Sequence, residues 1–284
     1  MPICTEAVGL ETDCYIYEIT KRKCLAFAAA LGETSEIFFD DNRDGGIFAV
    51  PSMTVALEWP PSRDIRTMQG FGATREERLR GVHAAQDTHF YRPIRPGDRL
   101  TSKGRLIAVE QVKPGVRIII RIDITGEAGE PVAKSYSTVI YREVASRGAD
   151  CIGEPTPAWP IGNENANWKV KTVSIPRELP HVYSECADLW NPIHTERRVA
   201  LDAGLPDIIL HGTCTWALSV KEVVASYIQG DPFRLARFTG RFTGMIIPGT
   251  EITIRHAEVG GGVQVEVIAA DGTMAMSRGR ATFY

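Results

Sequence analysis

The chain has 284 residues, of which 44% are hydrophobic and 24% are charged, and its formal net charge is −3. This length is typical of a globular protein of about two domain units, each able to bury its own core. A nearly balanced charge without a long basic run indicates neither nucleic acid nor a charged membrane surface. We therefore expect no nucleic-acid partner and no membrane partner.

Targeting signals and cysteine spacing indicate the expected compartment. The sequence contains no apolar run of about 18 residues that could form a transmembrane helix. It lacks a basic and then apolar signal at its start and a Ser-Lys-Leu type of peroxisomal signal at its end. The six cysteines show no CxxC spacing, which predicts reduced thiols and not disulfides or a zinc site. We expect a cytoplasmic protein with no metal and no cofactor.

The first half of the chain predicts helices followed by strands. The expected elements are a helix at residues 21–31, a polar loop at 40–46, a weaker helix at 53–58 and an irregular charged segment at 64–80. Segments rich in Ile and Val then predict strands at residues 82–91, 100–110, 116–123 and 134–144. Residues 146–166 hold Gly, Pro and Asn without periodicity, which predicts a linker.

The second half repeats the features of the first half in the same order. A Pro-Gly turn at residue 96 precedes one Val- and Ile-rich segment, and a Pro-Gly turn at residue 248 precedes another. Residues 129–141 and 272–284 each run from a turn glycine to a tyrosine and have the same length. One duplicated unit of roughly 140 residues explains this pattern better than one large domain.

We therefore predict an N-terminal unit at residues 1–150 and a C-terminal unit at residues 165–284. An unpaired sheet edge is a liability, because its free backbone groups recruit other strands. We expect the sheets of the two units to pair edge to edge as one antiparallel surface.

The most informative segment is Asn191-Pro192-Ile193-His194. Proline lacks an N–H and restricts the residue before it, so His194 should sit on a turn and not inside a helix. Residues 195–202 predict a short helix that ends near Gly204.

A long apolar helix is predicted at residues 212–229, so it begins at Gly212 directly after His211. Its apolar stripe contains Trp216, Val220, Val223, Val224 and Tyr227. A histidine near the free N–H groups of a helix start combines a proton acceptor with a site for negative charge on oxygen.

The segments Asn-Pro-Ile-His, Ala-Gly-Leu-Pro and Ile-Leu-His-Gly-Thr, in this order within residues 183–218, resemble the signature of MaoC-type dehydratases. These proteins are (R)-specific enoyl-CoA hydratases of the hotdog fold. The resemblance implies an α+β double hotdog fold, with two antiparallel sheets each wrapped around a long central helix. It also implies reversible addition of water to an enoyl thioester, or dehydration of a 3-hydroxyacyl thioester, carried by CoA or acyl carrier protein.

The resemblance also implies the roles of individual residues. His194 is the expected acid and base, and the Gly212 N–H is the expected oxyanion donor. The family pattern places an Asp five residues before the His, where this chain has Leu189, and the nearest carboxylate is Asp188. Asp188 is therefore the candidate for a shifted Asp–His pair.

Other residues of the signature are expected to bind substrate, namely Asn191, His211 and Thr213. Asn191 has the alternative role of holding the turn through its side chain, and His211 that of bonding a backbone carbonyl. In the first repeat, Phe38 occupies the place of His194, so this half should lack a base and shape the acyl pocket.

Three hypotheses about activity follow from the Leu189 position. Asp188 substitutes for the family Asp, or His194 acts alone on a substrate with a more acidic α-proton. Alternatively, the protein is a hotdog thioester-binding protein, a thioesterase or another proton-transfer enzyme that hydrates nothing. A homodimer is a further possibility that the sequence leaves open.

Overall fold

The computed structural model describes residues 2–163 and 166–284. The predicted unit limits at residues 1 and 165, and part of the predicted linker, fall on residues outside this description. Among the described residues, no helix is both long enough and apolar enough to cross a bilayer.

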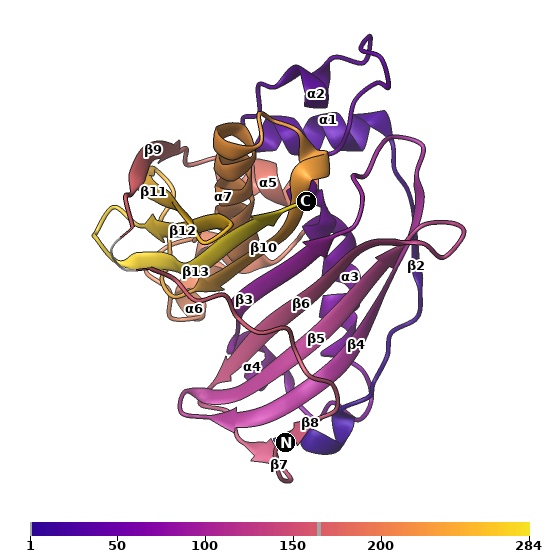
Figure 1. Ribbon diagram of the computed structural model, residues 1–284. Helices are drawn as coiled ribbons and strands as arrows, with labels where there is room; N and C mark the ends of the chain where they lie inside the picture. The colour runs from indigo at the N-terminus through magenta and orange to yellow at the C-terminus, as the bar shows by residue number, and fades with distance from the viewer. Residues whose placement is uncertain (1, 164–165) are drawn as a thin grey trace.

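One large antiparallel sheet runs through the molecule (Figure 1). Its first-half strands follow in spatial order as β2 (Tyr15–Glu18), β4 (Arg99–Val112), β5 (Gly115–Thr125), β6 (Pro131–Arg142) and β3 (Gly81–Phe90). The second-half strands continue the sheet as β10 (Leu235–Phe242), β13 (Met274–Phe283), β12 (Gly262–Ile268), β11 (Thr250–Val259) and β9 (Lys169–Ile175). The two predicted sheets thus pair edge to edge as one, and the prediction of a continuous surface is confirmed.

Strand β5 shows why these segments form a sheet that is covered on one face. Its even-numbered positions from Val116 to Ile124 are buried, while the odd positions from Arg117 to Thr125 are half-buried. β-Branched side chains at every second position fit a pleated surface with one face against a core.

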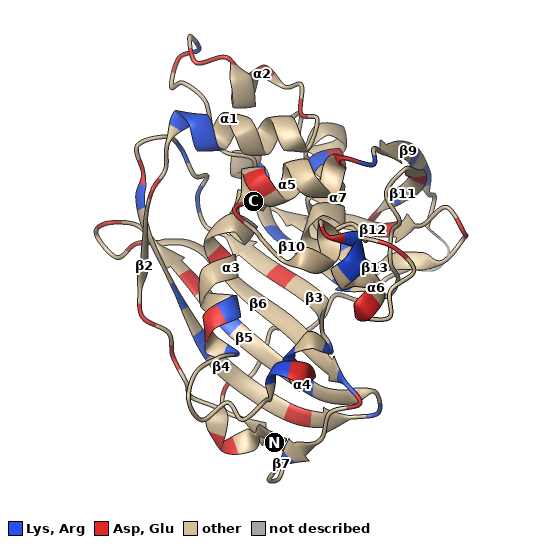
Figure 2. Cartoon of the chain, turned by 180° about the vertical axis from the view of Figure 1, so that it is seen from behind, with Lys and Arg blue, Asp and Glu red and all other residues tan. Residues whose placement is uncertain are grey.

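Two helices pack on the concave side of the sheet, one in each half. Helix α3 (Thr54–Ile65) contacts β4, β5 and β6, and helix α7 (Gly212–Tyr227) contacts β10, β12 and β13. The view from behind in Figure 2 shows α3 in front of the first-half strands. The predicted long helix is confirmed, and the weaker predicted helix is longer than expected although it contains Pro60 and Pro61.

Shorter elements complete the two halves. Helix α1 (Lys21–Ala30) packs against α5 (Leu179–Ala187). The remaining short elements are α2 (Glu36–Phe39), α4 (Arg75–Leu79), α6 (Arg197–Asp202), β1 (Ile3–Cys4), β7 (Ser146–Arg147), β8 (Cys151–Ile152), η1 (Thr5–Ala7), η2 (Pro51–Met53), η3 (Pro192–His194) and η4 (Pro232–Arg234).

Two predictions of irregular structure are wrong in part. The charged segment at residues 64–80 contains α4, whose first turn is closed by a reciprocal capping box between Thr74 and Glu77. The predicted linker contains β7, which pairs with β1, and β8, which pairs with β4. Pairing to distant strands stabilised these segments, and local composition does not reveal such partners. The six cysteines are not paired with one another in this structure.

The two halves join where β3 pairs with β10, from Ala85 opposite Arg241 to His89 opposite Arg237. Beside this ladder, Arg237 donates two hydrogen bonds to the buried Asp87 carboxylate, at 2.8 Å from Nε and 2.7 Å from Nη2. Since both groups are largely withdrawn from water, each depends on the other for its charge balance.

We predict that Asp87→Ala lowers the free energy of unfolding by about 3–5 kcal/mol, because it leaves the Arg237 charge buried without a partner. The matched control is Asp202→Ala, which removes a pair with Arg198 whose side chains are 74% and 93% exposed. That exposed pair should contribute almost nothing. Denaturant unfolding measures both variants, and equal losses would contradict the assignment.

Candidate active site

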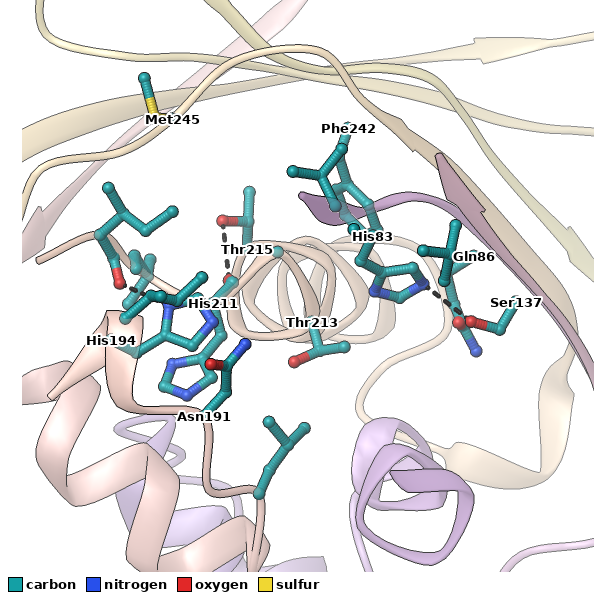
Figure 3. Close-up of a pocket in the computed structure, with 18 of the residues that line it drawn as sticks. His83, Gln86, Ser137, Asn191, His194, His211, Thr213, Thr215, Phe242 and Met245 are labelled. Atoms are coloured by element: carbon teal, nitrogen blue, oxygen red, sulfur yellow. Dashed lines mark hydrogen bonds between the residues drawn. The ribbon is translucent and has the colours of Figure 1, made fainter. Parts of the chain in front are cut away.

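A cavity of about 410 Å³ lies between the two halves of the protein. Residues of both halves line it, and Figure 3 shows the labelled side chains around the start of α7. Its volume lies within the range of about 300–1,000 Å³ that is typical of small-molecule sites.

His194 lies on the cavity wall at the end of the short turn η3, as the Asn-Pro sequence predicts. The Nδ1 atom of His194 is 2.8 Å from the carbonyl oxygen of Ile209. A carbonyl oxygen only accepts hydrogen bonds, so Nδ1 carries the proton of the neutral ring. The Nε2 atom of neutral His194 therefore holds a free lone pair.

His211 packs directly on His194. The two rings are stacked with their centroids 3.8 Å apart, and the Nε2 atom of His211 lies 3.1 Å from the Ser184 hydroxyl. The Nδ1 atom of His211 is buried and without a hydrogen-bond partner among the described residues. His211 is thus held in place by the Ser184 hydroxyl and by the His194 ring.

Burial keeps both imidazoles neutral at physiological pH. It lowers the pKa of His194 to about 4, and the Ile209 carbonyl opposes this effect only in part. Burial also lowers the pKa of His211 well below its usual value, and the neighbouring His194 lowers it further. His194 is therefore available as a proton acceptor.

The start of α7 lies next to this histidine pair, because His211 directly precedes Gly212. The first helical hydrogen bonds come from Cys214 and Thr215, which both donate to the His211 carbonyl. The N–H groups of Gly212 and Thr213 precede these bonds and belong to the free donors of a helix start. A Cβ atom at Gly212 would lie 3.3 Å from the Phe242 ring, so glycine leaves this approach open.

The structure brings most of the predicted site residues together. Asn191, His194, His211, Gly212 and Thr213 all line the cavity (Figure 3). The Oγ1 atom of Thr213 is buried and lacks a hydrogen-bond partner among the described residues.

Asp188 and Phe38 are placed elsewhere. Asp188 ends α5 in a left-handed conformation, its side chain is 75% exposed, and its carboxylate pairs with Lys23. The predicted shift of this carboxylate toward His194 is therefore not seen, because the turn directs it to α1. Phe38 is 1% exposed in the main hydrophobic core and is absent from the cavity wall.

Leu189, at the position of the family Asp, does line the cavity. Its side chain is 5% exposed, and its N–H donates to the Ser184 carbonyl at 3.0 Å. Position 189 therefore faces the cavity as the family pattern requires, but its leucine side chain is apolar.

The first half contributes polar residues that the sequence did not single out. Glu58, His83, Gln86 and Ser137 lie together on the opposite wall of the cavity, where Gln86 donates to Glu58 and the Ser137 hydroxyl pairs with His83. The only sequence signal was the mixture of polar side chains within a predicted buried strand. That signal becomes informative only when the partner strand is known.

Comparison with known proteins defines the class of this fold. A MaoC-like dehydratase from Phytophthora capsici superposes with a TM-score of 0.86 at 20% identity, covering 99% of this chain and 97% of that chain. A Mycobacterium tuberculosis protein described as a double hotdog superposes with a TM-score of 0.66 at 12% identity, covering 98% and 96%. The chain has the α+β double hotdog fold.

The sequence comparisons are consistent with that fold. Residues 183–276 match the MaoC like domain, and residues 6–135 match the FAS1-like dehydratase domain region. The 3-hydroxyacyl-thioester dehydratase Y of Mycobacterium tuberculosis is 25% identical, covering 97% of this chain and 95% of that protein. The chain thus contains a MaoC like domain in its second half and is similar over its length to MaoC-like dehydratases.

The low pKa of the buried histidines predicts a pH-dependent stability. The unfolded chain binds a proton at His194 near pH 6.5, whereas the folded protein does so only near pH 4. The unfolded state thus binds more protons as the pH falls through this window, and the free energy of unfolding should decrease, by up to about 3 kcal/mol from this group.

Denaturant unfolding at pH 7, 6 and 5 measures this slope. His194→Asn keeps an N–H near the Ile209 carbonyl but cannot titrate, so it should make the slope shallower. An unchanged slope in this variant would count against a buried neutral His194.

Proposed function

We propose that this protein catalyses the reversible addition of water to the double bond of an enoyl thioester. The observation that carries the proposal is the geometry of His194, whose Nδ1 is bonded to the Ile209 carbonyl while its unprotonated Nε2 remains available at the cavity. The MaoC like domain supports the same reaction class, and the similar Mycobacterium tuberculosis protein is named a 3-hydroxyacyl-thioester dehydratase.

In this mechanism, Nε2 of His194 removes a proton from water as the water oxygen bonds to Cβ of the substrate. The electron pair of the double bond moves toward Cα, and the thioester carbonyl becomes enolate-like. The Gly212 N–H at the start of α7 stabilises the negative oxygen. Protonated His194 then returns the proton to Cα, which completes a syn addition and regenerates the neutral ring.

The product follows from the face of attack, and we propose the (R)-3-hydroxyacyl thioester. Dehydration is the same path in reverse. Asn191, Thr213 and His211 would position the thioester, with either CoA or acyl carrier protein as carrier.

The environment of His194 supports the single-histidine form of the reaction. Leu189 contributes no carboxylate, and Asp188 is paired with Lys23 at the surface. Water then lacks a second anchor, and His194 alone would perform both proton transfers. Such an enzyme should favour substrates whose α-proton is more acidic than that of a simple acyl chain.

We predict that His194→Ala reduces the hydration rate by about 10²–10⁴-fold, because it removes the only proposed acid and base. Ultraviolet absorbance of the enoyl thioester measures the loss. Full activity of this variant on every enoyl and 3-hydroxyacyl thioester tested would refute the hydratase assignment.

Asp188→Asn should leave the rate within about twofold of the wild type, since surface substitutions away from a site are nearly neutral. The same assay measures it, and Lys23→Met serves as the matched control for loss of the surface pair. A large loss of hydration rate in Asp188→Asn but not in Lys23→Met would support the hypothesis that Asp188 acts together with His194.

Leu189→Asp tests whether a carboxylate at the family position would help to hold the attacking water. A carboxylate on this part of the cavity wall would hold the attacking water beside His194, so hydration of crotonyl-CoA should become faster. Leu189→Asn is the matched control for polarity without charge. A folded Leu189→Asp protein with no gain over this control would contradict the anchor argument.

A further inference from the structure

The cavity has two chemically different walls. Around His194, the second half contributes mainly apolar side chains, among them Leu189, Ile193, Ile209 and Ile246. The first half places a polar group on the opposite wall, and Figure 3 shows His83, Gln86 and Ser137 gathered there. A plain hydrocarbon chain would offer the Ser137 hydroxyl and the His83 ring no hydrogen bond beyond the one they share, whereas an oxygen on the ligand could add one.

A β-bulge in β3 creates this polar wall. His83 is opposite Val139 and Ala85 is opposite Thr138, so β3 contains one extra residue at this point. Side chains three positions apart in a regular strand point to opposite faces, but the extra residue lets His83 and Gln86 face the same cavity. Bulges of this kind are frequent beside active sites, where they redirect a side chain.

A buried carboxylate holds the polar group from behind. The Gln86 amide nitrogen donates to Glu58 at 2.7 Å and to the Thr88 hydroxyl at 2.9 Å, and Ser135 donates to the other Glu58 oxygen at 2.6 Å. Both N–H groups of Gln86 are thereby used, which fixes the orientation of its amide group beside His83.

His83 contacts an aromatic ring that lies beside the start of α7. Its Nε2 atom is 3.2 Å from the Ser137 hydroxyl, and its ring centroid is 4.9 Å from that of Phe242. Phe242 is the same ring that a Cβ at Gly212 would meet at 3.3 Å. One aromatic ring therefore separates the polar group from the start of α7, so an acyl group held at α7 can reach it.

We propose that the His83–Ser137 pair, which lies beside the Gln86–Glu58 pair, is a binding subsite for a hydroxyl or carbonyl oxygen on the acyl group of the substrate. The natural substrate is then an oxygenated acyl thioester and not a plain fatty acyl thioester. This inference rests on the proposed function only in assuming that a thioester occupies the cavity.

Binding of saturated thioesters tests the subsite separately from the chemistry, because these ligands have no double bond to hydrate. The probes are octanoyl-CoA and its 5-hydroxy, 5-oxo, 7-hydroxy and 7-oxo counterparts, with dissociation constants from calorimetry. At least one oxygenated ligand should bind about tenfold more tightly than octanoyl-CoA, as expected for one or two added hydrogen bonds.

Ser137→Ala and His83→Leu should each reduce this preference to about twofold or less. Val139→Ala is the matched control, because Val139 lies two positions along β6 and lines the same cavity without a polar atom. It should change the affinity for all five ligands by a similar factor. Circular dichroism checks that each variant is folded, and Ser137→Ala is the mildest change.

Equal binding of all five ligands by the wild type would overturn the subsite, as would a preference that survives in both Ser137→Ala and His83→Leu. Absence of binding for every ligand would also overturn it. A preference that depends on Ser137 in a protein that hydrates no enoyl thioester would refute the proposed function and keep the subsite. Hydration of crotonyl-CoA by a protein that binds all five ligands equally would support the proposed function and refute the subsite.

Discussion

The pairing of β3 with β10 is the constraint on which the rest of the structure depends. Each half alone would end in a strand with unpaired backbone groups. The ladder that runs from the Ala85–Arg241 pair to the His89–Arg237 pair provides hydrogen-bond partners for both of these edges. The same ladder places α3 and α7 over one continuous sheet. The cavity lies between the residues that these two helices and their strands contribute, so it is a product of the junction.

Exclusion of water by this arrangement decides the chemistry of the site. The stacked rings of His194 and His211 are nine-tenths or more buried, so both remain neutral and His194 keeps a lone pair at Nε2. Burial also strengthens the effect of the α7 start on a developing negative oxygen, because few solvent dipoles compete with it. The lack of a carboxylate at Leu189 means that the helix start and one imidazole provide most of the polar groups around the reacting atoms.

The two repeats contribute different residues to one cavity. Pro51 and Ser52 lie at the start of η2 and α3, much as His211 and Gly212 lie at the start of α7, so the duplicated geometry survives in both halves. The first half has replaced the histidine by the buried Phe38 and has placed Glu58 and His83 at other positions. It was expected to shape the acyl pocket, and it adds polar side chains, among them His83, Gln86 and Ser137, to the cavity wall.

The sequence by itself determined the duplicated architecture, the strands of both halves, the long helix at Gly212 and the turn that holds His194. These features depend on local patterns, namely alternation, helical periodicity and the restrictions of Pro and Gly, which a linear reading detects. It also showed that the family Asp is absent, since spacing from His194 is a property of the chain.

Only the tertiary structure decided where the remaining side chains point. Asp188 is one position from the family Asp, yet a left-handed residue at the end of α5 turns it to Lys23. His83 and Gln86 share a face only because β3 bulges against β6, and Glu58 meets them from a helix. Such contacts depend on strand register and on the packing of distant segments, and no local pattern encodes either of these.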